Sequence, residues 1–407
     1  MTVMVKDGVP SDAMVAYHKA RAEGGAGLII IEAARAHVSG DSDRPAIRAY
    51  KDACIPGYRR IAEACHPFDC KVFAQLSHPG REMTVASDGT HAVAVAPSSI
   101  PNERFHVMPR ELTPKLITEI IDGFETAAGR IRRAGLDGVE VVASHGYLVA
   151  QFFNARVNVR TDAYGGSFEN RMRFAREVLK AVRRGAGPDL AVGMRLSGEE
   201  KDHDGLDTSE CLAIARALVQ DGVLDYLNVT AGTSAGLAGS MHIVPAMTFE
   251  TGYTAPLAAN VRAKVDLPVF VAGRINQPQI AEEILVSGQS DMCGMTRALI
   301  ADPLMPNKAK NGQSDDIRAC VACNQACIGH MLNGFPISCI QHPETGRELE
   351  FGTRIPAKSP RQVMVVGGGP AGMKAASVAA ERGHDVTIYE SDSVLGGQVA
   401  QIGRAHV

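Results

Sequence analysis

Four cysteines near the end of the chain have a spacing that suits metal chemistry: Cys320, Cys323, Cys327 and Cys339. Clustered thiolates with short spacers can ligate one soft metal centre, because each sulfur reaches the same point from a tight turn. A structural zinc usually shows two separate Cys-x-x-Cys pairs. Here a single pair is followed closely by a third cysteine and, after a longer interval, by a fourth. The spacing therefore favours a 4Fe-4S cluster over the two alternatives, a zinc ion and a disulfide knot.

A second motif, Gly367-x-Gly369-x-x-Gly372, follows a predicted buried strand and opens a predicted helix, and the next predicted strand ends at Glu390. The glycines permit a tight turn and a close approach of a pyrophosphate to the helix N-terminus, and the acid can accept a hydrogen bond from a ribose hydroxyl. A glycine-rich turn without a ligand is the alternative. The order of strand, motif, helix, strand and acid predicts the start of a Rossmann-type dinucleotide-binding fold.

Seven apolar, β-branched runs precede these motifs and supply the frame that would position them. They cover residues 28–32, 72–76, 138–143, 190–196, 226–230, 268–272 and 291–295. Continuous rather than alternating hydrophobicity is typical of strands that are buried on both faces of a parallel sheet. Helical patterns lie between them, at 114–134, 168–184, 209–221 and 277–287. Strand–helix alternation over this length predicts an α/β fold of the (β/α)8 TIM barrel type.

Seven strands leave such a barrel one strand short. The first run already follows a helical pattern at 11–24, so we expect the missing first strand to precede Met1 in the complete protein. The dinucleotide-binding pattern stops at Val407 after a single β-α-β unit, and such a fold needs more strands to bury its sheet. We therefore expect the complete protein to extend beyond both ends of this chain.

Composition narrows the class of protein. The 407 residues suffice for two or three domains, and 45% hydrophobic with 21% charged residues is typical of a globular protein. A formal net charge of −3 gives no reason to expect nucleic acid or an anionic membrane as a partner. No signal-peptide pattern opens the chain, and no apolar run approaches the roughly 18 residues that span a bilayer. Cysteines without an export signal indicate the reducing cytoplasm.

Taken together, the motifs resemble the branch of the old yellow enzyme family that contains 2,4-dienoyl-CoA reductase and trimethylamine dehydrogenase. The resemblance covers essentially the whole chain. It is carried by Gln75-Leu-Ser-His78-Pro-Gly80-Arg81, Ser144-His145-Gly146-Tyr147-Leu-Val-Ala-Gln151, Arg160-Thr-Asp162-Ala-Tyr164-Gly165-Gly166-Ser-Phe-Glu169-Asn170-Arg171, Gly273-Arg274, Gly294-Met-Thr-Arg297, the four cysteines and the Gly367 motif. Each motif alone is moderately specific, whereas their order and spacing together are highly specific.

This resemblance implies an FMN-binding TIM barrel at 1–312, an iron–sulfur segment and linker at 313–358, and the N-terminal part of an FAD- or NAD(P)-binding domain at 359–407. The implied cofactors are FMN, a 4Fe-4S cluster and FAD (or ADP), with NAD(P)H as a further one in the complete protein. The residues implied for the dinucleotide are Gly367, Gly369, Gly372, Glu390 and Gln398. The implied partners are a small organic substrate and an electron-transfer flavoprotein or ferredoxin.

By the same resemblance, FMN is held by Gln75, Arg195, Gly273, Arg274, Gly294 and Arg297. Gln75 and Arg195 lie at the ends of predicted strands, where barrels place their chemistry. An amide can satisfy the pyrimidine edge of a flavin, and a cation can stabilise the reduced ring. The resemblance implies that Gly273-Arg274 and Gly294 to Arg297 hold the FMN phosphate. The alternatives are an Arg195 that pairs with a carboxylate, and tight turns with solvated arginines at this phosphate site. His78 and Arg81, also at a strand end, are candidates to line the substrate pocket.

Three side chains are candidates for catalysis: Tyr147, His145 and His242. In the reductases of the family, a tyrosine at the position of Tyr147, assisted by a histidine, protonates the substrate. Ene-reductases pair a histidine like His145 with a polar residue three positions earlier to hold a carbonyl oxygen, but that residue here is Val142. Dienoyl-CoA reductases tend to carry an acid at position 145, whereas amine dehydrogenases carry histidine. A packing role for Tyr147 and a surface-loop role for His242 are the alternatives.

These features predict an FMN-, 4Fe-4S- and FAD-dependent oxidoreductase, in which hydride passes between FMN and a small substrate and the cluster relays single electrons. His145 and Val142 favour oxidative N-demethylation of a methylated amine or amino acid. Two alternatives stay open. One is NADPH-dependent reduction of a 2,4-dienoyl-CoA, and the other is a non-catalytic fragment that only binds cofactors.

Overall fold

The computed structural model describes residues 2–42, 45–83 and 93–404, which form two compact units, Met1–Leu349 and Glu350–Val407. The main strands of the first unit are β3 (Leu28–Arg35), β4 (Lys71–Ser77), β7 (Gly138–Ala143), β8 (Ala191–Ser197), β9 (Tyr226–Thr230), β10 (Val269–Ala272) and β11 (Met292–Gly294). Its longer helices are α1 (Asp12–Glu23), α2 (Cys54–Cys65), α3 (Pro114–Arg133), α5 (Phe168–Ala186), α6 (Thr208–Gln220), α8 (Ala255–Arg262) and α9 (Pro278–Val286). Among the described helices, none combines the length and the apolar character that crossing a bilayer requires.

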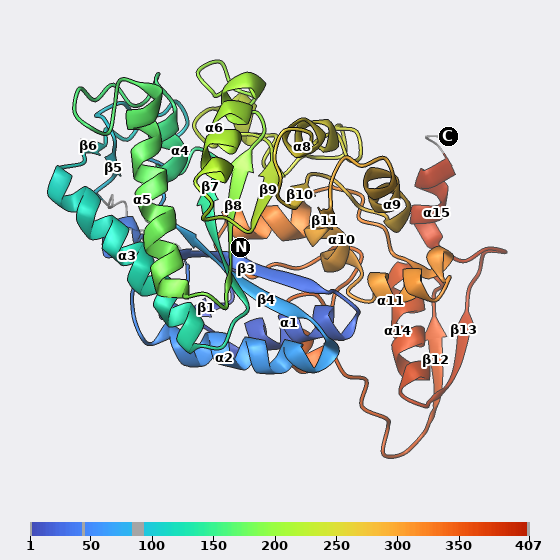
Figure 1. The fold of residues 1–407 in the computed structure, drawn as a ribbon. Helices are drawn as coiled ribbons and strands as arrows, with labels where there is room; N and C mark the ends of the chain where they lie inside the picture. Colours follow the sequence, from blue (N-terminus) through green and yellow to red (C-terminus); the bar gives the residue numbers. More distant parts are fainter. Residues whose placement is uncertain (1, 43–44, 84–92, 405–407) are drawn as a thin grey trace. The chain divides into compact units, whose positions relative to one another are not determined.

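The seven main strands form one curled parallel sheet in the order β11-β10-β9-β8-β7-β4-β3, with the helices outside it (Figure 1). All seven predicted strands are therefore confirmed, and so is the TIM-barrel type of fold. Within the described residues, β3 and β11 are the two edges of this sheet. The parallel arrangement brings the carboxyl ends of all seven strands to one face, where the loops that follow them meet.

Helix caps fix where three of the helices begin. The Thr113 side chain accepts a hydrogen bond from the Leu116 backbone N–H at 3.2 Å, and Ser167 caps α5 in the same way. Asp207 and Glu210 form a reciprocal capping box at the start of α6. Each cap satisfies backbone donors that would otherwise lack partners, and it determines where the preceding loop ends.

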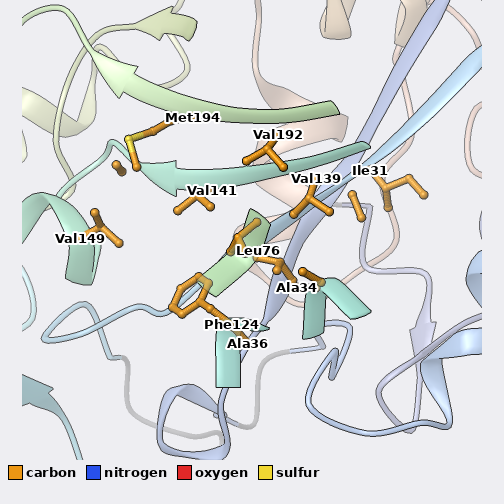
Figure 2. Packing of buried hydrophobic residues seen from close by; sticks show 14 of the residues in the cluster. Ile31, Ala34, Ala36, Leu76, Phe124, Val139, Val141, Val149, Val192 and Met194 are labelled. Carbon is orange, nitrogen blue, oxygen red and sulfur yellow. The ribbon is translucent and has the colours of Figure 1, made fainter. Parts of the chain in front are cut away.

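The core lies between the sheet and its outer helices, and Figure 2 shows part of it around β4, β7 and β8. Val139 and Val141 of β7 pack with Val192 of β8, Leu76 of β4 and Phe124 of α3, and all five are fully buried. All six residues of β7 are buried, which confirms a strand covered on both faces.

The second unit contains the parallel pair β12 (Gln362–Val366) and β13 (Asp385–Tyr389), joined by α14 (Pro370–Glu381) and followed by α15 (Gly397–Arg404). This confirms the predicted opening of a Rossmann-type fold. Gly367 has φ +101°, a conformation that favours glycine. A Cβ atom on Gly372 would lie 1.9 Å from the Gly367 carbonyl oxygen, so only glycine fits at position 372.

Candidate active site at the carboxyl ends of the barrel strands

The fully buried carboxylate of Glu140 connects three strands in the middle of the sheet. It accepts hydrogen bonds from Gln75 Nε2 at 2.5 Å, from Asn228 Nδ2 at 2.9 Å and from the Tyr226 hydroxyl at 3.1 Å. Because the Gln75 amide nitrogen donates to Glu140, the Oε1 atom of Gln75 is presented as an acceptor. Sequence analysis identified Gln75 but missed Glu140. The sequence feature that could have indicated Glu140 is a single acid inside an otherwise apolar strand.

Arg195 of β8 is half-buried, and its Nε atom is shielded from solvent without a hydrogen-bond partner. Throughout the described part of the chain, no carboxylate forms an ion pair with it, which argues against the carboxylate-paired alternative. An unpartnered buried donor is costly unless a ligand supplies an acceptor. Gln75 therefore offers an acceptor and Arg195 a donor, which fits the pyrimidine edge of a flavin, where an N–H lies between carbonyl groups.

His145 follows β7 and is held in the left-handed backbone region, with φ +60°. The Ser234 backbone N–H and hydroxyl both lie within hydrogen-bond distance of the His145 carbonyl oxygen, at 3.0 and 2.8 Å. The Gly232 carbonyl accepts a hydrogen bond from the imidazole, and Nδ1 is shielded from solvent without a partner. Burial, and then the charge of Arg195, lower the pKa of His145 to about 3. The imidazole is therefore neutral, and with its proton on Nε2, toward the Gly232 carbonyl, the unpartnered Nδ1 accepts a hydrogen bond.

Tyr147 contacts this histidine, and His242 lies close to Gly232. The Tyr147 ring makes an edge contact with the His145 ring, with 6.4 Å between the centroids. His242 lies in the loop after β9, where its Nδ1 is 3.3 Å from the Tyr253 hydroxyl. Its Cβ is 2.9 Å from the position that a Cβ on Gly232 would occupy. A side chain at Gly232 would therefore displace the loop that carries His242.

The loops after β10 and β11 are the predicted phosphate site. Arg274 has φ +51°, and its Nε atom is shielded without a hydrogen-bond partner. Gly273 packs so closely on Thr254 that a Cβ would lie 2.1 Å from the hydroxyl oxygen, and Gly294 is exposed at the end of β11. A free donor beside exposed backbone suits an anion. The role of these residues in phosphate binding stays a prediction.

Arg297 makes contacts that the sequence did not indicate. Its Nη1 atom donates to the Pro245 carbonyl and to Asn324 Oδ1, both at 2.8 Å. Its side chain also lines the cavity formed by the four cysteines. Burial lowers the pKa of Arg297, whereas the neighbouring Cys320 and Cys327 raise it. The guanidinium therefore faces the cysteine segment, and its contact with a phosphate stays a prediction.

Cys320, Cys323, Cys327 and Cys339 together line one cavity, whose other walls include Ile300, Val321, Ala322, Ala326 and Ile340. All four are free thiols, which excludes the disulfide alternative for this structure. The loop winds around the cavity because Ala322 and Asn324 both have left-handed backbones, with φ +56° and +58°. The Ala322 N–H lies 3.4 Å from Cys320 Sγ, and such donors stabilise a thiolate.

The separation of the sulfur atoms bears on which metal centre would fit. In a tetrahedral zinc site the sulfur atoms lie about 3.8 Å apart, because each Zn–S bond is about 2.3 Å long. Among the described residues, no three of the four cysteine sulfurs lie within 4.8 Å of one another. The donor set is all-sulfur and surrounds a wider space than one ion fills, which fits an iron–sulfur cluster better than zinc.

In the second unit, the Glu390 carboxylate is bound by the glycine turn itself. Its Oε2 atom accepts from the Gly368 N–H at 2.7 Å, and Oε1 accepts from the N–H groups of Ser391 and Asp392 at 2.6 and 3.1 Å. These backbone donors lower the pKa of Glu390 to about 2. The Gly396 N–H donates to the Gly368 carbonyl at 2.9 Å, so the first turn of α15, with Gln398, begins beside the glycine turn.

His78 and Arg81 are both buried, and Arg81 also lines a small cavity with Gln151 and Glu200. His78 is 1% exposed, with Nε2 2.9 Å from the Ser39 hydroxyl and Nδ1 accepting from the Gly80 N–H at 3.1 Å. Arg81 Nη1 donates to the carbonyls of Ile100 and Pro101 at 3.1 and 3.0 Å. The hydrogen bonds of both residues hold neighbouring loops in place. A role of His78 and Arg81 in lining the substrate pocket stays a prediction.

A buried acid at this small cavity gives the fold a testable pH dependence. Glu200 is 4% exposed, and burial raises its pKa to about 7 although Oε2 accepts from the Leu206 N–H at 2.8 Å. The pKa of Glu200 is higher in the folded chain than in the unfolded chain, where it lies near 4.5. Its contribution to the free energy of unfolding is therefore fully present below pH 4.5 and is lost as the pH rises through 7.

We expect Glu200→Gln to remove this loss. Between pH 5 and pH 8, the native chain should lose up to about 3 kcal/mol more unfolding free energy than the variant. Urea unfolding at the two pH values measures the difference. Glu282→Gln, at an exposed position of α9, is the matched control and should behave as the native chain does. An identical pH dependence in Glu200→Gln and native protein would contradict the expectation.

Comparison with known proteins defines the class to which this barrel and site belong. The sequence pattern of the NADH:flavin oxidoreductase / NADH oxidase family matches residues 1–316, and that of the FAD-dependent oxidoreductases matches residues 362–406. The chain therefore belongs to the NADH:flavin oxidoreductase / NADH oxidase family, a family of flavin-dependent oxidoreductases. This confirms the resemblance to the old yellow enzyme family.

Individual relatives have different named activities. The chain is 39% identical over 398 residues to the NADH oxidase of Thermoanaerobacter brockii, covering 97% of this chain and 60% of that protein. It is 38% identical over 406 residues to the N,N-dimethylglycine/sarcosine dehydrogenase of Chromohalobacter salexigens, covering 98% and 58%. A solved 2-naphthoyl-CoA reductase in complex with 2-naphthoyl-CoA matches with a TM-score of 0.89 and 31% identity, covering 98% of this chain and 62% of that one. The chain thus spans about three-fifths of the length of these curated relatives.

Proposed function

We propose that this chain carries the substrate site of an FMN- and 4Fe-4S-dependent oxidoreductase that oxidises N-methylated amines or amino acids. Its relatives include a dehydrogenase named for N,N-dimethylglycine and sarcosine. The observation that carries the proposal is the polarity of His145, whose shielded Nδ1 is an acceptor without a partner.

A neutral acceptor discriminates between the two substrate classes. An amine N–H can donate to Nδ1, whereas the carbonyl oxygen of an enone or thioester would bring two acceptors together. With a pKa of about 3, His145 does not carry the proton that a carbonyl clamp needs. Val142, three residues earlier, is apolar and fully enclosed in β7, so it offers no donor either. The site therefore favours an amine over a carbonyl substrate.

The residues present suit loss of hydride from an N-methyl carbon. In a secondary amine such as sarcosine, a hydrogen bond from the N–H to His145 Nδ1 increases electron density on the substrate nitrogen. The positive charge of Arg195 disfavours the ammonium form, so the nitrogen keeps its lone pair. A flavin, when bound at Gln75 and Arg195, supplies the two-electron acceptor. The C–H bond of the methyl group then breaks with its electron pair leaving as hydride, and the resulting iminium adds water and releases formaldehyde and the demethylated amine.

The proposed cofactors follow from the three parts of the chain. FMN would be held by Gln75, Arg195 and the loops after β10 and β11, and a cluster would be held by the four cysteines. FAD or ADP would lie on the Gly367 turn. Electrons would leave singly to an electron-transfer flavoprotein or ferredoxin, or would enter from NAD(P)H in the complete protein.

Reduction of an unsaturated thioester is the second candidate. The fold neighbour that binds 2-naphthoyl-CoA supports it, and so does the contact between the Tyr147 and His145 rings, which places a phenol donor beside the site. In that direction Tyr147 would protonate the substrate carbon that does not receive hydride.

Anaerobic absorbance spectroscopy separates the two directions. The chain, loaded with FMN and with iron and sulfide, is mixed with sarcosine in one arm. In the other arm it is reduced with dithionite and mixed with a 2,4-dienoyl thioester. We expect sarcosine alone to bleach the flavin bands and to release formaldehyde.

Two results would decide against the proposal. Reoxidation by the thioester, together with no bleaching by sarcosine between pH 7 and pH 9, would establish the reductase instead. A chain that retains no flavin would support the non-catalytic fragment.

A further inference from the structure

Three hydrogen bonds connect the loop that carries His242 to the loop between the cysteines, one of them directly and two through Arg297. We call residues 232–249 the His242 loop. Asn324 Nδ2 donates to the Val244 carbonyl, Arg297 Nη1 donates to the Pro245 carbonyl, and Arg297 Nη1 also donates to Asn324 Oδ1, each at 2.8 Å. The contacts lie 80, 52 and 27 residues apart in the sequence, so they connect separate parts of the first unit.

One end of this connection reaches the candidate active site. Val244 lies two residues after His242, whose ring contacts Phe249 with 4.9 Å between the centroids. The same loop begins at Gly232, whose carbonyl binds the His145 imidazole. Displacement of Val244 and Pro245 would therefore move side chains next to His145.

The other end reaches the cysteine cavity. Asn324 follows Cys323 directly, has a left-handed backbone with φ +58°, and accepts from the Gly329 N–H at 2.9 Å through its carbonyl. Arg297 lines the cavity itself. A metal centre that ties Cys323 and Cys327 to one point would fix the backbone between them, and with it the direction of the Asn324 side chain.

We propose that Asn324 and Arg297 are positioning residues that link occupation of the cysteine cavity to the conformation of the His242 loop. The inference rests on the proposed metal centre. Filling the cavity fixes the backbone on both sides of Asn324 and so stabilises its hydrogen bond to Val244, which makes opening of the loop rarer in the metal-loaded chain. By reciprocity, ordering the loop strengthens metal retention by the same factor.

Amide hydrogen exchange measures opening of the His242 loop directly, and it does not depend on enzymatic turnover. The backbone N–H groups of Met241, His242 and Ile243 donate to carbonyls within the loop, at 3.3, 3.1 and 3.3 Å, so their exchange reports its opening. Exchange is compared between the iron-loaded chain and the same chain stripped with a chelator. In native protein we expect these amides to exchange about tenfold faster without iron, as is typical of coupled sites.

Asn324→Ala tests the hydrogen bond between the two loops, because it removes the donor to the Val244 carbonyl. Its loop amides should exchange fast in both iron states, because the connection is already broken. Asn324→Asp keeps an acceptor for Arg297 but loses the donor to Val244, and should be intermediate. The control is Asn276→Ala. Asn276 Nδ2 donates to the Cys320 carbonyl at 2.8 Å and so holds the cysteine loop, and within the described residues its side chain forms no hydrogen bond with the His242 loop. Its loop amides should keep the native response to iron.

The outcomes distinguish this inference from the function on which it rests. A native chain that binds iron but shows the same exchange with and without it overturns the inference and leaves the metal centre standing. A native chain that binds no iron overturns both. An Asn324→Ala variant that keeps the full iron response also overturns the inference, because the link would then run elsewhere. In steady-state assays, the expected change for Asn324→Ala is a higher KM for the amine with a smaller effect on kcat.

Discussion

Replacing Cys323 with serine is expected to abolish binding of iron and acid-labile sulfide. Cys323 lines the cavity with three other thiols, and a hydroxyl is a poor ligand for the soft iron of a sulfur-bound centre. Flavin binding should stay largely intact, because Gln75 and Arg195 lie on β4 and β8 of the sheet. Iron and sulfide analysis of the reconstituted variant, together with its flavin absorbance, measures both effects.

Cys293→Ser is the matched control for this experiment. Cys293 is half-buried in β11, and its thiol lies 3.8 Å from the Ala281 carbonyl rather than at the cavity. This variant should bind as much iron as the native chain. One zinc atom per native chain, without sulfide, would refute the cluster and the electron relay with it.

Replacing His145 with alanine is expected to slow flavin bleaching by sarcosine by tenfold to a hundredfold. The change removes the acceptor for the amine N–H, and such a hydrogen bond contributes about 1.5–3 kcal/mol when a buried partner is left without it. Stopped-flow absorbance under anaerobic conditions measures the rate. Because the pKa of His145 lies at about 3, the native pH profile should show no step from this residue near pH 6.5.

His145→Asn provides the control at the same position. Asparagine tolerates the left-handed backbone of residue 145 and retains an amide oxygen as acceptor, so it should recover part of the rate. Equal bleaching rates in native protein and His145→Ala would show that Nδ1 does not contact the amine. The amine proposal would then lose its main support.

The sheet could be predicted from local sequence because each strand is a continuous apolar run. The observed bounds of β7 and β9 match the predicted runs at 138–143 and 226–230. Helix caps such as Thr113 were equally local signals. Features that depend on burial from both faces, or on a residue's immediate neighbours, are therefore accessible to sequence analysis.

The site could be predicted only as a set of residue types. Arg297 illustrates the reason, because its hydrogen-bond partners lie 27 and 52 residues away and no periodic pattern indicates them. The tautomer of His145 depends on the Gly232 carbonyl, which another loop supplies. Glu140 was missed because its partners come from two other strands, β4 and β9. Contacts between loops follow from the tertiary fold and leave little trace in the local sequence.

The fixed amide of Gln75 has a consequence for which heterocycle the barrel accepts. Glu140 occupies the amide nitrogen, so Gln75 cannot rotate to offer a donor without leaving a buried carboxylate short of a partner. We therefore expect this edge to favour ring systems that present an N–H to Gln75 Oε1 over those that are alkylated there. The carboxylate never has to touch the ligand to exert this selection. The hydrogen bond from Gln75 to Glu140 is already formed in the folded chain without a cofactor. It fixes the Gln75 amide so that its oxygen is available to a ligand.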